Sequence, residues 1–306
     1  MTDDHEPQVS AEDGGPPDPG PDPGTGWTPA GQQHDNRHFV SDYFRMERWE
    51  IPPPAGSDAP PAFGGRAPVD AHLRNAAGGL RTGGLLTVVD SLGGFTSGIA
   101  VLPEWIVTTS IMASVHRLDH RGPLVLTSRV LRRGRTAVVT AIDAVDEGDG
   151  NAPVAHVVMT CAVLDPGAMD LGFHRPFSLP MLEPDPAAPV PEEFFRIRPG
   201  TGPVTRLDLA DHLRNPWGIL HGGAVAVLAD VAACRAAEGD GPDGPDTWSA
   251  SDTVLHYLRP VKVGPVEARC QVLGGRGNRR LVRVAVHDVG AEDRLVTLGT
   301  VTVVGA

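Results

Sequence analysis

The segment from Asn215 to Asp230 combines residue types that can polarise a carbonyl group and act on its carbon. His221 is followed by Gly222 and Gly223, and then by the apolar run AVAVLAD. The first N–H groups of a helix have no partners within it, and glycines let a ligand approach them closely. Such amides can stabilise an oxyanion. Asp230 falls within the apolar run, where a carboxylate is costly unless it is paired or used.

An altered copy of this segment occurs earlier in the chain. Asn75 precedes Asn215 by 140 residues, and Asp90 precedes Asp230 by the same 140. Tryptophan, Gly-Pro and Arg-Gly positions recur in the same order further on, which indicates a tandem repeat of one domain. A lone aspartate could simply hydrogen-bond a neighbouring loop. Its presence in both copies favours a catalytic role.

The turn before the first apolar run differs from its counterpart. Arg81 and Thr82 stand where the second copy has His221 and Gly222. The group that would bind a carbonyl is therefore in doubt in the first copy.

Helix geometry predicts which groups meet. Asp230 follows His221 by nine residues, which is half a turn around the axis and about 13.5 Å along it. One helix cannot easily bring both groups to one substrate, so we expect each site to join the helix start of one copy to the aspartate of the other. The two expected sites are Asn215, His221 and Gly222 with Asp90, and Asn75 and residues 81–83 with Asp230.

The surrounding pattern is α+β. An apolar segment of helical length, 84–94 or 222–237, precedes four runs rich in β-forming residues in each copy. This pattern predicts, twice, a long central helix wrapped by an antiparallel sheet, with the two sheets joined into one. The expected strands are 106–115, 124–131, 137–145 and 154–164, then 253–258, 266–273, 281–287 and 295–304.

The motif N-x-x-G-x-x-H-G-G, with an aspartate nine residues after the histidine, resembles that of the phenylacetate-pathway (PaaI-like) hotdog acyl-CoA thioesterases. Residues 257–260 and 264–265 resemble that family's strand after the helix. The resemblance is strong over 191–306 and weak over 70–165. It implies two tandem hotdog domains and the hydrolysis of an acyl-CoA thioester with neither a cofactor nor a metal.

The resemblance also implies residue roles. Asn215 and His221 would lie near the thioester carbonyl, the Gly222 N–H would polarise it, and Asp230 would be the general base or nucleophile, as Asp90 would be at the other site. A Ser or Thr of the family falls at Ala250, although serines flank it.

Four further residues are candidates for substrate binding. Asn75 and Gly223 belong to the expected sites. Arg133 and Arg276 lie in matching Arg-rich hairpins, where they are either solvated turn charges or contacts to coenzyme A phosphates. The cluster His116, Asp119 and His120 could suggest a metal site, but we expect a surface turn there and no metal.

Composition predicts the domain plan. Residues 1–36 contain eight acidic residues and no Lys or Arg, so we expect a disordered tail. Domains are expected at 37–165 and 191–306, joined by a Pro-rich linker at 166–190, and 52–68 reads as a loose stretch.

The charge and the cysteines of the chain limit its expected partners and cellular location. The net charge of -12 argues against nucleic acid. Three widely spaced cysteines, no signal peptide and no apolar run approaching a membrane span favour a cytoplasmic protein away from membranes. We expect a homo-oligomer built from internal hotdog dimers.

Two other functions remain open at this point. A hotdog hydratase or dehydratase would act on the α- and β-carbons of an acyl-CoA, although the nine-residue spacing argues against it. A non-catalytic acyl-CoA binding protein is compatible with the altered turn at residues 81–82. The sequence leaves the acyl chain undetermined.

Overall fold

The computed structural model describes residues 40–53, 55–56, 62–165, 178–215, 217–239 and 247–305. The expected disorder of residues 1–36, and the part of the expected linker at 166–177, lie outside these ranges.

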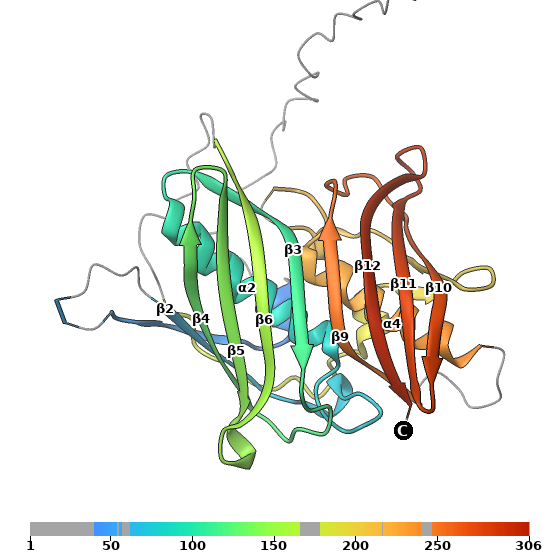
Figure 1. The fold of residues 1–306 in the computed structure, drawn as a ribbon, viewed down its shortest axis with the longest axis horizontal. Helices are drawn as coiled ribbons and strands as arrows, with labels where there is room; N and C mark the ends of the chain where they lie inside the picture. The colour runs from blue at the N-terminus through green and yellow to red at the C-terminus, as the bar shows by residue number, and fades with distance from the viewer. Residues whose placement is uncertain are drawn as a thin grey trace, which may run out of the picture.

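Within this part of the chain, twelve strands form one antiparallel sheet, and its central strands lie at the front of the molecule (Figure 1). Its order is β1-β2-β4-β5-β6-β3-β9-β12-β11-β10-β8-β7. The strands are β1 Glu47–Ile51, β2 Ala62–Ala67, β3 Trp105–Val115, β4 Leu124–Arg133, β5 Ala137–Asp146, β6 Ala152–Leu164, β7 Ile197–Pro199, β8 Val204–Leu207, β9 Trp248–Tyr257, β10 Val266–Arg276, β11 Arg279–Asp288 and β12 Arg294–Gly305.

The two halves join at the centre of this sheet. Strand β3 pairs with β9 from Ser110 opposite His256 to Ala113 opposite Thr253. The predicted continuous sheet is thereby confirmed. The eight strands expected from the sequence are present, with most ends extended by up to five residues and β9 ending one residue early, at Tyr257.

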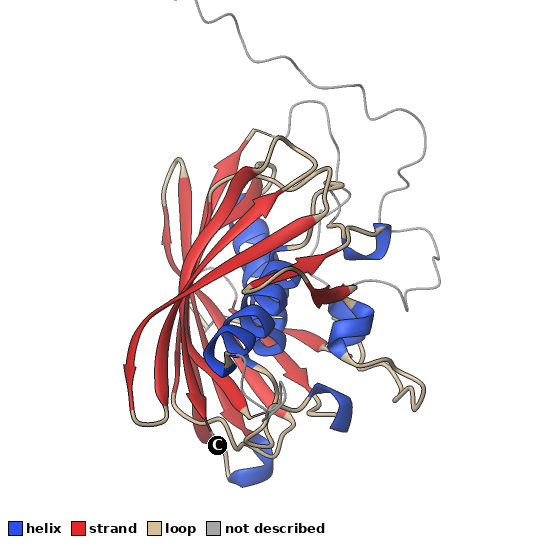
Figure 2. Ribbon diagram, turned by 90° about the vertical axis from the view of Figure 1, so that its right-hand side faces the viewer, coloured by secondary structure: helices blue, strands red, loops and turns tan. Residues whose placement is uncertain are grey.

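Two long helices lie side by side on the concave face of the sheet (Figure 2). They are α2 Thr82–Val101 and α4 Gly222–Glu238, and each contains one of the apolar segments that were expected to be helical. Two four-residue helices, α1 Val40–Tyr43 and α3 Pro191–Phe194, and short 3₁₀ turns at Ala71–Leu73, Glu147–Asp149 and Asp211–Leu213 complete the described helices.

The expectation that no apolar run approaches the length of a membrane span is wrong for α2. This helix has 20 residues and is apolar enough to cross a membrane by composition alone. Most of its residues are buried against the sheet and α4. Core helices of soluble proteins have the same composition, because they are apolar on every side.

Glycines allow the two helices to pack closely. A Cβ at Gly83 would lie 2.7 Å from the Cα of Val227, and a Cβ at Gly223 would lie 2.6 Å from Cγ2 of Thr87. The contact is reciprocal, since residues 83 and 87 occupy the repeat positions of 223 and 227. Each helix start therefore packs against the middle of the other helix.

Three further expectations need correction. The loose stretch 52–68 contains β2, which pairs with β1 and β4 and extends the sheet beyond the predicted strands. Strands β7 and β8 extend the other edge in the same way. His120, expected at the surface, is buried, and its Nε2 accepts a hydrogen bond from the Leu80 N–H.

Part of the expected linker packs against the start of the first half. Leu179 forms a β-bridge with Arg48. The Tyr43 hydroxyl donates a hydrogen bond to the carbonyl of Pro189, and its ring stacks on Phe194 of α3 with centroids 4.0 Å apart. Residues 178–194 thus cover the region in front of the α2 start.

Candidate active site

Asp90 lies in the middle of α2 and reaches the start of α4. Its side chain is only 8% exposed. Oδ1 accepts a hydrogen bond from the Thr108 hydroxyl at 2.8 Å, and Oδ2 accepts one from the Gly223 N–H at 3.1 Å. The carboxylate of one half is therefore held against the helix start of the other, as helix geometry predicts.

His221 is the N-cap of α4. Its Nδ1 accepts a hydrogen bond from the Gly223 N–H at 3.0 Å and lies 3.3 Å from Asp90 Oδ2. Burial lowers the pKa of His221, and the nearby charge of Asp90 only partly opposes this. The imidazole is therefore neutral near pH 7, with its proton on Nε2 because Nδ1 is the acceptor.

Gly222 offers the open donor of the site. Its N–H is the first amide of α4 and has no acceptor within the described part of the chain. Its carbonyl, which belongs to the following Gly222–Gly223 peptide, accepts a hydrogen bond from the Tyr257 hydroxyl at 3.0 Å. A Cβ here would lie 2.7 Å from Asp90 Oδ2, so only glycine allows the carboxylate to come this close.

Asn215 organises the loop that leads into α4. Its Oδ1 accepts hydrogen bonds from the N–H groups of Trp217 at 3.0 Å and Ile219 at 3.3 Å. The Trp217 ring contacts Trp105 of β3 edge to face, with centroids 3.8 Å apart. Asn215 therefore holds the loop before α4 in place, and its predicted contact with a thioester carbonyl stays a prediction.

The reciprocal site around Asp230 has a different lining. Oδ2 of Asp230 accepts a hydrogen bond from the Gly83 N–H at 2.8 Å, which parallels the contact of Asp90. At the position of the histidine, Arg81 forms an ion pair of 2.5 Å with Glu192 of α3. Burial raises the pKa of Asp230, and the charge of Arg81 partly offsets this rise. A carbonyl would have to compete here with an arginine and a carboxylate.

The remaining predicted residues of the first half make hydrogen bonds within the protein, and their predicted roles at a substrate stay predictions. Asn75 Oδ1 accepts a hydrogen bond from the Gly79 N–H at 3.1 Å, so it organises a loop as Asn215 does. The Thr82 hydroxyl donates to the carbonyl of Ala250 at 2.6 Å.

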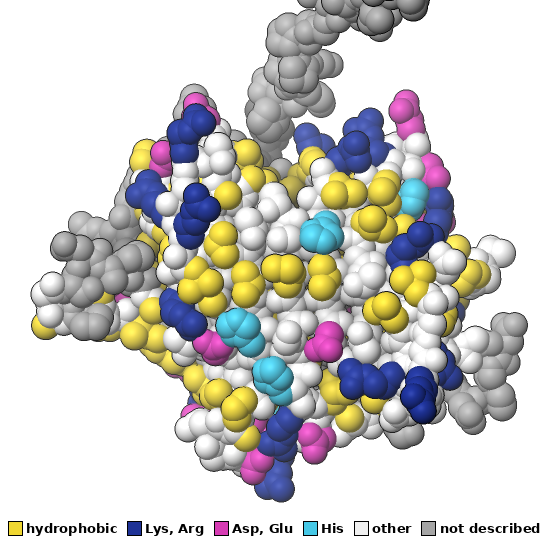
Figure 3. Space-filling view, in the orientation of Figure 1, with side chains coloured by type: hydrophobic (Ala, Val, Ile, Leu, Met, Phe, Trp, Pro, Cys, Tyr) yellow, Lys and Arg dark blue, Asp and Glu magenta, His cyan; other side chains and the backbone are white. Residues whose placement is uncertain are grey.

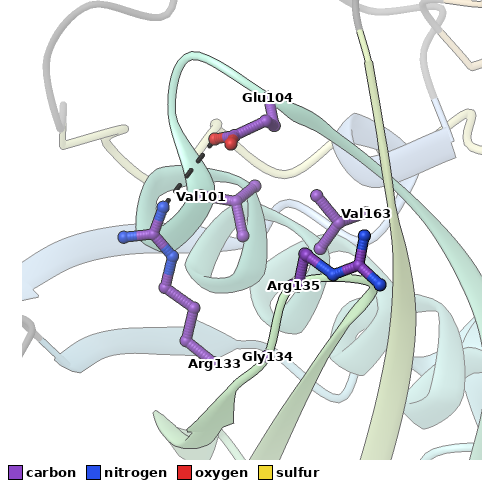
Figure 4. A pocket seen from close by; sticks show the side chains of 6 residues that line it. All are labelled: Val101, Glu104, Arg133, Gly134, Arg135 and Val163. Carbon is purple, nitrogen blue, oxygen red and sulfur yellow. Dashed lines mark ion pairs between the residues drawn. The ribbon is translucent and has the colours of Figure 1, made fainter.

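The two predicted phosphate contacts lie away from both aspartates. Arg133 lines a cleft of about 300 Å³ beyond the end of α2, together with Glu104 and Arg135 (Figure 4). Arg276 is an exposed residue at the end of β10. Among the described residues, no group of His, Cys, Asp or Glu is placed to hold a metal ion.

Two residues of the Asp90 site had no role assigned from the sequence. Thr108 follows Asp90 by eighteen residues and is the fourth residue of β3. A hydroxyl residue near the beginning of the strand after the helix was the available signal. Tyr257 belongs to the segment that carries the family resemblance, but its contact with the Gly222 carbonyl depends on the path of β9 past the helix start.

This geometry suits chemistry at a carbonyl carbon. One carboxylate, one hydroxyl, one neutral imidazole and one open helix amide converge at the boundary between the two halves. Amides of this kind stabilise negative charge on a carbonyl oxygen, and a positioned carboxylate can act as base or nucleophile.

Solved structures with a similar fold identify the fold class. The tesB protein of Mycobacterium avium subspecies paratuberculosis superposes with a TM-score of 0.56 at 15% identity, over 80% of this chain and 92% of that chain. The 12:0-ACP thioesterase from Umbellularia californica gives 0.55 at 10% identity, over 80% and 94%. The acyl-CoA thioesterase II TesB2 from Mycobacterium marinum gives 0.50 at 14% identity, over 87% and 96%. At these identities the likeness shows the fold alone, which is of the hotdog type.

A family model adds a sequence match in the second half. Residues 218–293 match the Thioesterase superfamily. The matched segment includes His221, Gly222 and Asp230 and ends in the turn between β11 and β12. No curated protein matches the sequence at a significant level.

Proposed function

We propose that this protein hydrolyses an acyl-CoA thioester to the free acid and coenzyme A. The observation that carries the proposal is the placement of Asp90 against the open amide of Gly222. The match of residues 218–293 to the Thioesterase superfamily supports it. The PaaI-like subtype is part of the proposal, because its motif is intact in the second half.

In the proposed reaction, the thioester carbonyl oxygen accepts a hydrogen bond from the Gly222 N–H. The His221 Nε2–H is available as a second donor. Asp90 takes a proton from a water molecule as the oxygen of that water attacks the carbonyl carbon. Collapse of the oxyanion breaks the C–S bond, and the leaving thiolate takes up the proton held by Asp90.

Direct attack by Asp90 is the second route. The carboxylate oxygen would then form a mixed anhydride with the acyl group and expel the thiolate, and water would hydrolyse the anhydride. In single-turnover hydrolysis in ¹⁸O-labelled water, label in Asp90 would establish the anhydride route with water attack at the aspartyl carbon. Water attack at the acyl carbon would label only the product acid, so trapping of the acyl group on Asp90 is the complementary test.

We also propose that the chain contains two hotdog units, at residues 37–165 and 191–306, derived from one domain. In support, a long helix and four following strands occur in the same order in both halves. The three cysteines are free thiols, which supports a reducing cytoplasmic setting.

A homo-oligomer is a further part of the proposal. The outer face of the sheet carries half-exposed apolar side chains near its centre, among them Met112 at 44% and Leu298 at 38% (Figure 3). Burial of such a face against a second copy would remove apolar surface from water.

The proposed activity is tested with the purified full chain and a panel of aromatic, short and medium acyl-CoA thioesters. Release of free thiol with equimolar acid supports hydrolysis. Hydration of an enoyl-CoA without thiol release would favour the hydratase, and saturable binding without turnover would favour the binding protein.

A further inference from the structure

We propose that the cleft beyond the end of α2 binds the phosphates of coenzyme A, with the pantetheine arm lying along α2 from Asp90. This inference rests on the proposed function and makes it more specific, because it selects a coenzyme A thioester over a carrier-protein thioester.

The cleft has the charge that a phosphate group needs. Arg132, Arg133 and Arg135 converge on the hairpin between β4 and β5, and Arg133 and Arg135 line the cleft. In Figure 4, Arg133 reaches across to Glu104, whereas Arg135 extends beside Val163. Within the described residues, Glu104 is the carboxylate that lines this cleft.

The existing ion pair can be exchanged for a ligand. Arg133 and Glu104 are 3.7 Å apart, and their side chains are 55% and 45% exposed. A pair so exposed contributes little to stability. A guanidinium binds a phosphate through two parallel hydrogen bonds, so a phosphate can replace the carboxylate as the partner of Arg133.

The distance from the reacting carbonyl fits the length of the arm. Val101, which lines the cleft, follows Asp90 by eleven residues and lies on the same helix face about 16.5 Å further along. About thirteen bonds separate the sulfur of coenzyme A from its first phosphorus, equivalent to four or five residues of extended backbone and so roughly 15 Å.

Two glycines, Gly94 and Gly98, leave the face of α2 between these points uncrowded by side chains of its own. A Cβ at Gly94 or Gly98 would meet no atom closer than Ile106, at 4.0 Å. Trp105, next to Glu104, contacts Trp217 from the loop before α4. The two rings therefore join the helix start that would bind the carbonyl to the cleft that would bind the phosphates.

The matching hairpin of the second half is engaged differently. Arg280 lies over the Trp248 ring at 5.3 Å, and Arg279 is 3.8 Å from Asp252. The helix of this second half carries Asp230, and the site around Asp230 contains Arg81. The double variant Arg279→Ala/Arg280→Ala is therefore a control of equal charge change in the equivalent hairpin.

The test compares two thioesters of one acyl group, one carried by coenzyme A and one by N-acetylcysteamine, which lacks the phosphates. In the double variant Arg133→Ala/Arg135→Ala, KM for the acyl-CoA should rise about tenfold to a hundredfold, as for the loss of a charged hydrogen bond. The kcat/KM for the N-acetylcysteamine thioester should stay unchanged. Glu104→Gln should lower KM for the acyl-CoA, and Arg279→Ala/Arg280→Ala should leave both substrates unaffected.

Two results would overturn the inference: an unchanged KM for the acyl-CoA in the double variant, or an equal loss on both substrates. Failure of the proposed function has a different signature, because the wild-type protein would then turn over neither thioester. In that event, calorimetric titration with coenzyme A alone decides. Weaker binding by the double variant supports the cleft, and equal binding or none contradicts it.

Discussion

Replacement of Asp90 by asparagine should remove most of the activity. The amide keeps the shape of the carboxylate and can still accept the hydrogen bond from Thr108. It cannot accept a proton from water, and an NH₂ group at the Oδ2 position would face the Gly223 N–H, donor against donor. Loss of a general base costs about a hundredfold or more in rate, or about 2.7 kcal/mol of transition-state stabilisation.

Asp230→Asn is the matched control, because this residue occupies the same position of the second helix. Its partner turn contains Arg81, which is already paired with Glu192. We therefore expect kcat/KM for the best acyl-CoA to fall only slightly. Thermal unfolding and circular dichroism of both variants establish that each is folded.

The reverse pattern would refute this reasoning. If Asp230→Asn abolishes thiol release and Asp90→Asn is mild, catalysis occurs at the site that contains Arg81. If both variants keep the full rate, neither carboxylate is catalytic.

Further predictions concern stability, pH and the hydroxyl beside the carboxylate. Gly83→Ala should lower the free energy of unfolding by about 1–3 kcal/mol in urea denaturation, because its Cβ would lie 2.7 Å from the Cα of Val227; an unchanged midpoint would contradict the close helix contact. Since burial lowers the pKa of His221 below 6.5, kcat/KM should stay level as pH falls to that value and decrease only in more acidic buffer; a decrease centred above it that disappears in His221→Gln would disprove this. Burial raises the pKa of Asp230 above 3.8, so its stabilising contribution is complete below that value and is lost as pH rises; urea unfolding at about pH 4 and about pH 8 should show wild type losing stability relative to Asp230→Asn, and a constant difference would argue against it. Thr108→Ala should reduce kcat about tenfold or more, as for the loss of one hydrogen bond to a charged group, and an unaltered kcat would leave the hydroxyl without a catalytic role.

Much of the scaffold was predictable because the chain repeats one pattern. Each apolar segment and each β-rich run occurs twice, so ambiguous runs could be assigned by comparison of the two copies. The short edge strands escaped detection. Residues 62–67 read AFGGRA and residues 197–199 read IRP, and their pairing depends on neighbouring strands rather than on their own β propensity.

The sequence correctly predicted that each aspartate meets the start of the other helix, but not which face of the helix makes this contact. The prediction was based on the half turn that separates His221 from Asp230. The helix contact uses Gly223, Val227 and Asp230, which share one face at spacings of four and three residues. Because each aspartate lies on the same face as the glycine of its own helix, two crossing helices bring each aspartate to the partner's first turn.

Contacts between segments far apart in the chain could not be predicted from the sequence. The meeting of Trp105 with Trp217 depends on where the loop before α4 passes the start of β3. The buried His120 accepts a hydrogen bond from the backbone N–H of Leu80, forty residues earlier in the chain. Neither contact has a local signature, since hydrophobic periodicity reports one element at a time.

The position of a bound thioester tests the central claim most directly. A crystal structure of the Asp90→Asn variant with an unhydrolysed acyl-CoA would reveal it. We predict that the carbonyl oxygen accepts a hydrogen bond from the Gly222 N–H at about 2.7–3.1 Å, with residue 90 beside the carbonyl carbon. A carbonyl bound instead at residues 81–83, beside Asp230, would contradict the assignment of the active site.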